Sequence, residues 1–141
     1  ERLLEGGWLR TLDLVRRDSD GYVKVIGRLD DMIICGGENI YPTEVENLLL
    51  GHPGIADVAV VPRRDEIKGE VPVAFIVTRP GAELSEDAIK RYALDHGPAY
   101  AHPRSVYRLD ELPLTAAKKV DRAALKAMVQ ERGGRQGEAS A

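Results

Sequence analysis

The chain has 141 residues, with a hydrophobic share of 43%, a charged share of 30% and a formal net charge of −3. These values are typical of one soluble globular domain with a buried core. The slight negative charge and the low aromatic content argue against partners such as nucleic acid or an anionic membrane surface. The longest clean apolar run, 71–77, is too short to span a bilayer. The single cysteine excludes an internal disulfide and favours a reducing, cytoplasmic setting.

The first part of the chain predicts a β-hairpin. Residues 8–16 and 22–26 are rich in strand-forming residues in loose alternation. The segment DSDG at 18–21 lies between them and has the composition of a turn, in which the glycine can take a positive φ. Because the chain begins at Glu1, without methionine and just before a strand-like run, we expect a truncated start.

A helix is predicted where the period of the apolar residues changes. Pro42 and Thr43 begin this helix, and Gly51 ends it. Thr43 and Glu46 also have the spacing of a capping box, in which the threonine hydroxyl and the glutamate carboxylate bond the first backbone N–H groups.

The rest of the chain predicts a compact α+β unit. Residues 55–62 and 71–78 are rich in valine and isoleucine and predict central strands joined by a charged loop, and 105–109 predicts a third strand. Ser85 and Asp121 are predicted N-caps of two further helices.

The last residues differ in composition from this unit. Residues 133–141 contain glycine, glutamine, serine, alanine and charges, and cannot bury enough apolar surface to order themselves. We therefore expect a disordered tail there.

Two segments carry chemical motifs: GRLDDMIICGGENIYPTEVE at 27–46 and LPLTAAKKVDRAAL at 112–125. Their order and separation resemble two signature motifs of the adenylate-forming superfamily, which includes acyl-CoA synthetases, peptide-synthetase adenylation domains and luciferases. The resemblance covers roughly 7–125. It implies an α+β lid domain over 30–132, with a small three-stranded sheet flanked by helices, preceded at 1–29 by the terminal hairpin of a large adenylation domain.

Candidate nucleotide-binding and hinge residues lie near the hairpin. The segment RTLDL resembles the family's R-T-G-D-L, which implies that Asp13 accepts hydrogen bonds from the ribose hydroxyls of ATP. A carboxylate suits this role because it only accepts. Leu12 stands where the family usually has glycine. The G-R-x-D match implies that Arg28 reaches the ribose or phosphates and that Asp30 is the hinge between two catalytic poses. The alternative is an exposed polar strand residue for Asp13, and a surface ion pair for the other two.

A double glycine follows the hinge motif. Gly36 and Gly37 permit close backbone approach and unusual φ/ψ values, and a plain tight turn is the simpler explanation. In the family this loop lines the tunnel for the incoming thiol. The resemblance therefore implies that Gly36, Gly37 and Glu38 line a CoA tunnel.

Lys119 is the candidate catalytic residue. Pro113, Lys119, Val120 and Arg122 match the family motif P-x-x-x-x-G-K-[VI]-x-[RK], in which the lysine bridges the substrate carboxylate and the α-phosphate. A cation there offsets the repulsion of two anions; at about 4 Å and an effective dielectric near 20, one contact is worth roughly 4 kcal/mol. Lys118 stands where glycine is usual. The alternative is a solvated lysine before a helix.

The resemblance as a whole implies the lid of an ATP-dependent carboxylic acid–CoA ligase, inactive by itself. ATP and CoA are then the expected cofactors, and Mg²⁺ is expected to bind outside this chain. The expected partners are the missing N-terminal adenylation domain and a carboxylic acid. The three histidines are far apart in the sequence and predict no metal site. Two alternatives stay open: an adenylation domain that loads a carrier protein, and a non-catalytic regulatory or interaction domain, which Leu12 and Lys118 slightly favour.

Overall fold

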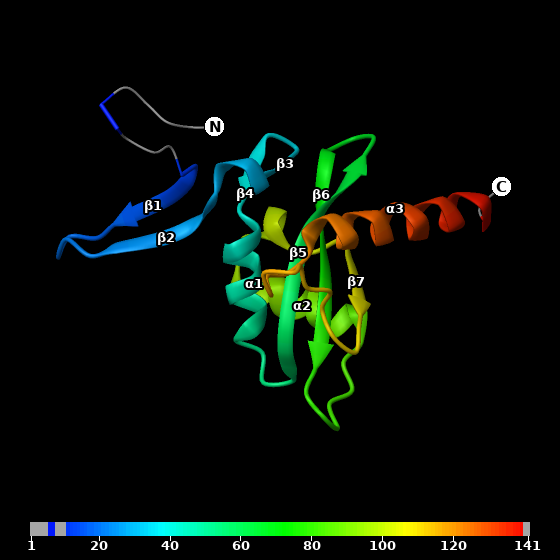
Figure 1. Ribbon diagram of the computed structural model, residues 1–141. Helices are drawn as coiled ribbons and strands as arrows, with labels where there is room; N and C mark the ends of the chain where they lie inside the picture. Colours follow the sequence, from blue (N-terminus) through cyan, green and yellow to red (C-terminus); the bar gives the residue numbers. More distant parts are fainter. Residues whose placement is uncertain (1–5, 8–10, 140–141) are drawn as a thin grey trace.

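A computed structural model describes residues 6–7 and 11–139. In this structure a five-stranded sheet lies between helices, and a two-stranded hairpin lies beside it (Figure 1). The sheet contains β3 (Ile33–Cys35), β4 (Glu38–Ile40), β5 (Ile55–Asp65), β6 (Gly69–Thr78) and β7 (Ser105–Arg108). Its order is β4-β3-β6-β5, with β7 also paired to β6. All pairs are antiparallel except β6 with β7. Because β5 stands at the end of this order and pairs with β6 alone among the described strands, it is an edge strand.

The helices cover both faces of the sheet. Helices α1 (Pro42–Leu50) and α2 (Glu86–His96) pack on one face, where Val45, Leu49, Ile89 and Ala93 join a buried cluster. Helix α3 (Arg122–Ala139) packs on the other face, and Leu125 and Val129 join a second cluster around Phe75. The alternation of β5 explains the two clusters, since Val58 and Val60 belong to the first, and Ala59 and Val61 to the second.

The hairpin consists of β1 (Asp13–Arg17) and β2 (Val23–Arg28), so a hairpin was predicted correctly, although its first strand begins at Asp13 and not within the predicted residues 11–12. The predicted strand start at 8–10 lies outside the described residues. The turn is stabilised by Asp18, whose carboxylate accepts hydrogen bonds from the backbone N–H groups of Asp20 (3.0 Å) and Tyr22 (2.9 Å). A short 3₁₀ turn, η1 (Leu29–Asp31), connects the hairpin to β3.

The α+β class and both predicted N-caps are confirmed. The Ser85 hydroxyl accepts from the Ala88 N–H at 3.1 Å, and the Asp121 carboxylate accepts from the Ala124 N–H at 3.1 Å. The sheet, however, has five strands rather than three. The additional β3 and β4 have three residues each, which is too short for an alternating pattern to be recognised in the sequence.

The predicted capping box is wrong. Helix α1 has Tyr41 as its N-cap without a side-chain hydrogen bond, and Thr43 lies inside the helix. Glu46 instead accepts a hydrogen bond from the Val60 N–H of β5 at 3.0 Å. The Glu46 carboxylate therefore bonds a backbone group of β5, and not the start of its own helix as the local spacing predicted.

The end of the chain also differs from expectation. Helix α3 continues to Ala139, whereas the composition predicted a disordered tail from residue 133. Propagating a helix from a packed first half avoids a new nucleation step, so a polar sequence can continue a helix that has already formed. Among the described residues, no helix is long and apolar enough to cross a membrane.

Candidate active site

The structure brings three of the predicted site residues together at the base of the hairpin. Asp13 and Arg28 are partners at the open end of β1 and β2, and Asp30 follows in η1. The Arg28 Nε and Nη2 atoms donate to the two carboxylate oxygens of Asp30 at 3.1 and 3.4 Å. Arg28 Nη1 lies 3.8 Å from Asp13 Oδ1. One guanidinium is thus shared by the predicted ribose acceptor and the predicted hinge.

The electrostatics of this cluster follow from its geometry. The hydrogen bond and the charge of Asp30, with a smaller contribution from Asp13, raise the pKa of Arg28 above its ordinary value. All three side chains are between 38% and 45% exposed, so solvent screens the pair. This is the surface ion pair that the sequence offered as the simpler alternative, and it leaves the carboxylate of Asp13 accessible from solvent.

The two departures from the family's glycines have a common backbone feature. Leu12 and Lys118 have φ values of 63° and 60°, and they are the non-glycine residues with positive φ in the described part of the chain. Glycine reaches this left-handed region without a steric clash, whereas a residue with a Cβ is strained there. The glycine of the family motif is therefore explained at both positions by backbone conformation.

The double glycine forms the turn between β3 and β4. Cys35 pairs with Glu38, and the two residues between them, Gly36 and Gly37, have φ values of 58° and 88°. Positive φ at both central residues is what a type I′ hairpin turn requires. A Cβ at Gly36 would lie 3.0 Å from the Lys68 side chain, whereas one at Gly37 would meet no atom within 4 Å. Gly37 therefore faces open space.

The turn between β5 and β6 supports this glycine turn. The Asp65 carboxylate accepts hydrogen bonds from the backbone N–H groups of Lys68 (2.8 Å) and Ile67 (3.0 Å), and these bonds lower its pKa. The Lys68 carbonyl in turn accepts from the Gly36 N–H at 2.8 Å. The charged segment to which the sequence assigned no chemistry thus holds the glycine turn in place.

Lys119 lies in a tight hairpin before α3. Leu114 and Val120 form a bridge, the Lys118 N–H donates to the Thr115 carbonyl (2.9 Å), and the Thr115 N–H donates to the Lys119 carbonyl (2.7 Å). This is a turn followed by a left-handed residue, a position that favours glycine. Among the described residues, no carboxylate lies within ion-pair distance of Lys119, whose side chain is exposed.

Sequence reasoning missed a polar contact next to this hairpin. Arg122 Nη2 donates to Glu46 Oε1 at 2.8 Å, and Arg122 Nη1 donates to the Val60 carbonyl at 2.8 Å. The side chains of Arg122 and Glu46 are 28% and 14% exposed. The motif match at Arg122 was the only signal for this contact, because its two partners are distant in the sequence.

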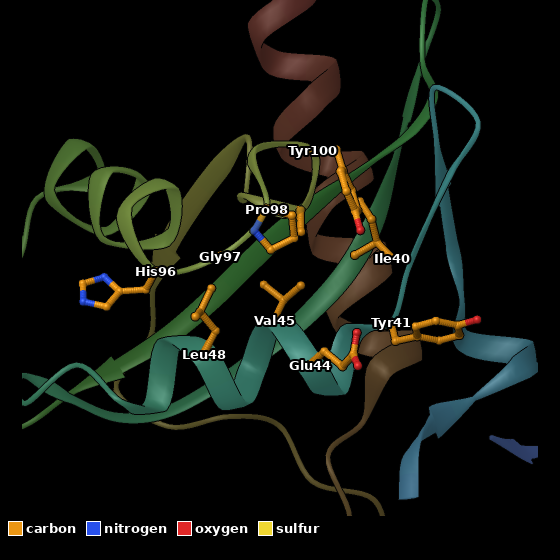
Figure 2. A pocket seen from close by; sticks show the side chains of 10 residues that line it. Ile40, Tyr41, Glu44, Val45, Leu48, His96, Gly97, Pro98 and Tyr100 are labelled. Atoms are coloured by element: carbon orange, nitrogen blue, oxygen red, sulfur yellow. The ribbon is translucent and has the colours of Figure 1, made fainter. Parts of the chain in front are cut away.

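A small pocket also escaped prediction. It has a volume of about 140 Å³ and lies between α1 and the segment after α2. Figure 2 shows Val45, Leu48 and Pro98 around it, while the ring of Tyr41 points away. The motif at 27–46 supplies one wall of this pocket, including Val45, but the opposite wall comes from 96–101, which only the fold brings beside it.

The predicted site residues therefore fall into three groups. Asp13, Arg28 and Asp30 are in contact, the glycine turn lies at β3–β4, and Lys119 lies on the separate loop before α3. Among the described residues, no three His, Cys, Asp or Glu side chains are placed to hold a metal ion.

The family described as "AMP-binding enzyme C-terminal domain" matches residues 44–119. The chain belongs to this family. The match begins in α1, includes β5, β6 and β7, and ends at Lys119. The cluster of Asp13, Arg28 and Asp30 and the glycine turn lie before the matched segment of the AMP-binding C-terminal domain.

Longer relatives extend the comparison. The chain is 40% identical over 128 residues to a 2-succinylbenzoate–CoA ligase of Bacillus cereus, covering 91% of this chain and 26% of that protein. An o-succinylbenzoate CoA synthetase of Bacillus subtilis, solved with the acyl-adenylate intermediate, has a TM-score of 0.80 at 39% identity, covering 88% of this chain and 25% of that one. An amide bond synthetase of Marinactinospora thermotolerans has a TM-score of 0.84 at 34% identity, with coverages of 89% and 26%. This AMP-binding C-terminal domain thus spans about a quarter of the length of these relatives.

Proposed function

We propose that this chain is the C-terminal lid of an ATP-dependent carboxylic acid–CoA ligase, working with a large N-terminal adenylation domain. The observation that carries the proposal is Lys119, which ends the family segment on a constrained turn with its ammonium exposed to solvent. The similarity to a 2-succinylbenzoate–CoA ligase at 40% identity supports the same reaction class.

In the first half-reaction a carboxylate oxygen of the acid attacks the α-phosphorus of ATP. The bond to pyrophosphate breaks, and an acyl adenylate forms. Lys119 would lie between the carboxylate and the α-phosphate. Its charge would offset the repulsion between these two anions, which is greatest in the transition state, where they are brought together. Asp13 fits the ribose because its accessible carboxylate can only accept hydrogen bonds, and Arg28 beside it would face the nucleotide.

In the second half-reaction the lid would rotate about Asp30 in η1. The CoA sulfur then attacks the acyl carbon, the bond to AMP breaks, and the thiol proton leaves to solvent. Gly36, Gly37 and Glu38 would line the path of the pantetheine arm, and the open space beside Gly37 is compatible with a slender ligand. The glycine turn and Lys119 lie on separate loops. This arrangement suits a lid that presents Lys119 during adenylation and the glycine turn during thioester formation.

ATP and CoA are the cosubstrates of this proposal. Mg²⁺ would neutralise phosphate charge and, in our proposal, is held by the large domain. A cytoplasmic location is also proposed, in keeping with the free, buried Cys35.

The proposal is tested on the intact protein that contains this chain. We expect acid-dependent ATP–pyrophosphate exchange with at least one member of a panel of aromatic and aliphatic acids that includes 2-succinylbenzoate. Addition of CoA should then release AMP and yield the thioester. Absence of exchange with every acid would refute the proposal and favour a non-catalytic domain.

The acceptor is the second point to test, because the amide bond synthetase is similar to this chain at 34% identity. An amine or a carrier-bound pantetheine would then replace free CoA after the same adenylation. Supplying the acyl adenylate with CoA, with an amine or with a carrier protein that bears a free pantetheine thiol compares the three rates directly. We expect CoA to react fastest.

A further inference from the structure

We propose that Arg122 and Glu46 act as a clamp that positions the Lys119 loop against the edge of the sheet. The first observation is the state of that edge. Strand β5 is an edge strand, yet Val60 in its middle is fully buried. Its N–H and C=O bond to Glu46 and Arg122. Buried backbone groups without partners are costly, so these two side chains replace a missing neighbouring strand.

The second observation is the closed geometry of the clamp. Arg122 uses two nitrogens of one guanidinium, one for the Val60 carbonyl and one for Glu46. Glu46 Oε1 accepts from both Arg122 and the Val60 N–H. A planar guanidinium can hold two such bonds in a fixed orientation, whereas a lysine ammonium is a single point charge on a flexible stem. The clamp therefore needs arginine rather than any cation.

The third observation links the clamp to the loop. Residues 114–119 are all exposed, so core packing does not hold them. The loop is closed at its base, where the Asp121 N–H donates to the Pro113 carbonyl at 2.8 Å. Leu112 anchors the entry in the apolar core, and Arg122 follows Asp121 directly at the exit. The clamp is the polar tie between the exit of the loop and the sheet, and Arg122 is a positioning residue.

This inference makes a prediction for the chain itself. Arg122→Gln should lower the hydrogen-exchange protection of the Val60, Lys118 and Asp121 amides by about tenfold or more, since local opening becomes easier. The matched control is Lys90→Gln, which removes the Lys90–Glu86 pair (2.6 Å) on α2, where the Lys90 side chain is 27% exposed. It should leave these amides unchanged. Unchanged loop protection in Arg122→Gln, with the chain folded by circular dichroism, would overturn the inference.

The catalytic consequence rests on the proposed function and is measured in the intact enzyme. Arg122→Gln should lower the adenylation kcat by about one to two powers of ten and leave thioester formation from preformed acyl adenylate within about twofold. Arg122→Lys should recover only part of the loss. In a double-mutant cycle, Glu46→Gln should add little to Arg122→Gln. Equal losses in both half-reactions would contradict a positioning role.

The two arms separate the possible failures. An unaltered intact protein that adenylates no acid would refute the proposed function, and the exchange measurement would still decide whether the clamp orders the loop. Conversely, if the enzyme is active but the hydrogen-exchange protection of the loop amides is the same in Arg122→Gln, the clamp is refuted and the proposed function stands.

Discussion

At the residue scale, Leu12 and Lys118 hold a left-handed backbone conformation that side chains rarely adopt. An L-residue in this region costs about 1–2 kcal/mol. Each strained residue precedes a proposed site residue, Asp13 in one case and Lys119 in the other. Strain of this kind persists only where neighbouring hydrogen bonds determine the backbone, and Lys118 has such a bond to Thr115.

Relieving this strain should stabilise the chain. Lys118→Gly should raise the free energy of unfolding by about 0.5–1 kcal/mol, because the relieved strain exceeds the entropy that glycine adds to the unfolded state. Ala117→Gly is the matched control, since Ala117 is not among the residues with positive φ. It should destabilise by about 0.4–1 kcal/mol. Urea unfolding of both variants checks the signs, and destabilisation by Lys118→Gly would contradict the strain.

The charge of Lys119 should matter in one half-reaction alone. In the intact enzyme, Lys119→Ala should slow adenylation by roughly two to four powers of ten, as expected for the loss of one well-placed charge. Thioester formation from preformed acyl adenylate should be nearly unchanged. Lys118→Ala is the neighbouring control and should leave adenylation intact. If Lys118→Ala is the damaging change, the motif alignment is wrong by one residue.

At the element scale, short turns present several of the proposed site residues, whereas Asp13 and Arg28 lie on β1 and β2. The turn η1 carries Asp30, the β3–β4 turn carries the two glycines, and the hairpin before α3 carries Lys119. Each is held by backbone hydrogen bonds, for example from Leu29 to the Leu12 carbonyl at 2.9 Å. In the proposed enzyme, the core can therefore stay rigid while these turns face the large domain.

Restricting the backbone at Asp30 should separate the two half-reactions. Asp30→Pro fixes φ near −65°, which should hold the lid in one pose and affect adenylation and thioester formation unequally. Asp30→Ala is the control, because it removes the contact with Arg28 and keeps backbone freedom. It should change both steps only slightly. Equal losses from Asp30→Pro would show that Asp30 is merely structural.

The open side of the glycine turn makes a further prediction. Gly37→Asn places a side chain where a Cβ meets no protein atom, and asparagine tolerates positive φ better than most residues. If the pantetheine arm passes here, thioester formation should fall by about tenfold or more while adenylation is retained. Separate assays of both steps check this. Unchanged thioester formation would place the tunnel elsewhere.

At the scale of the whole molecule, the five-stranded sheet is covered by helices on both faces, whereas the β1–β2 hairpin lies beside the sheet and contacts α1 through Arg16 and Glu44 (3.9 Å). Val15, Val23 and Val25 of the hairpin are 49%, 62% and 56% exposed. The two buried clusters, by contrast, draw all their residues from the unit between β3 and α3. The hairpin fits the proposed neighbouring domain, since it carries apolar surface without a core.

The chain by itself should fold but not catalyse. We expect cooperative urea unfolding by circular dichroism, because both clusters are closed around β5 and β6. We expect no ATP–pyrophosphate exchange with any acid, because the proposed nucleotide and acid pockets belong mainly to the large domain. Exchange above background from this chain alone would contradict the proposal that the nucleotide and acid pockets belong mainly to the large domain.

Local patterns were sufficient for much of the fold. The long strands β5 and β6 and the caps Ser85 and Asp121 depend on neighbouring residues, and they were predicted. Both strands, however, extend into the charged segment that was predicted as a loop, to Asp65 and from Gly69. The three-residue strands β3 and β4 were missed because so short an alternation carries little signal. The roles of Lys119 and Asp30 came from motif spacing and remain predictions.

The sequence by itself determined the α+β class, the family motifs and the two positions where a glycine is replaced. Each of these depends on residue type and on spacing along the chain. Only the tertiary structure decided that Glu46 bonds β5 and Arg122 instead of capping its own helix. It also decided that Leu12 and Lys118 are strained, and that Arg28 joins Asp13 to Asp30. The physical reason is that a carboxylate bonds the donor that packing brings within about 3 Å. Such a donor can lie far away in the sequence, where no local pattern records it.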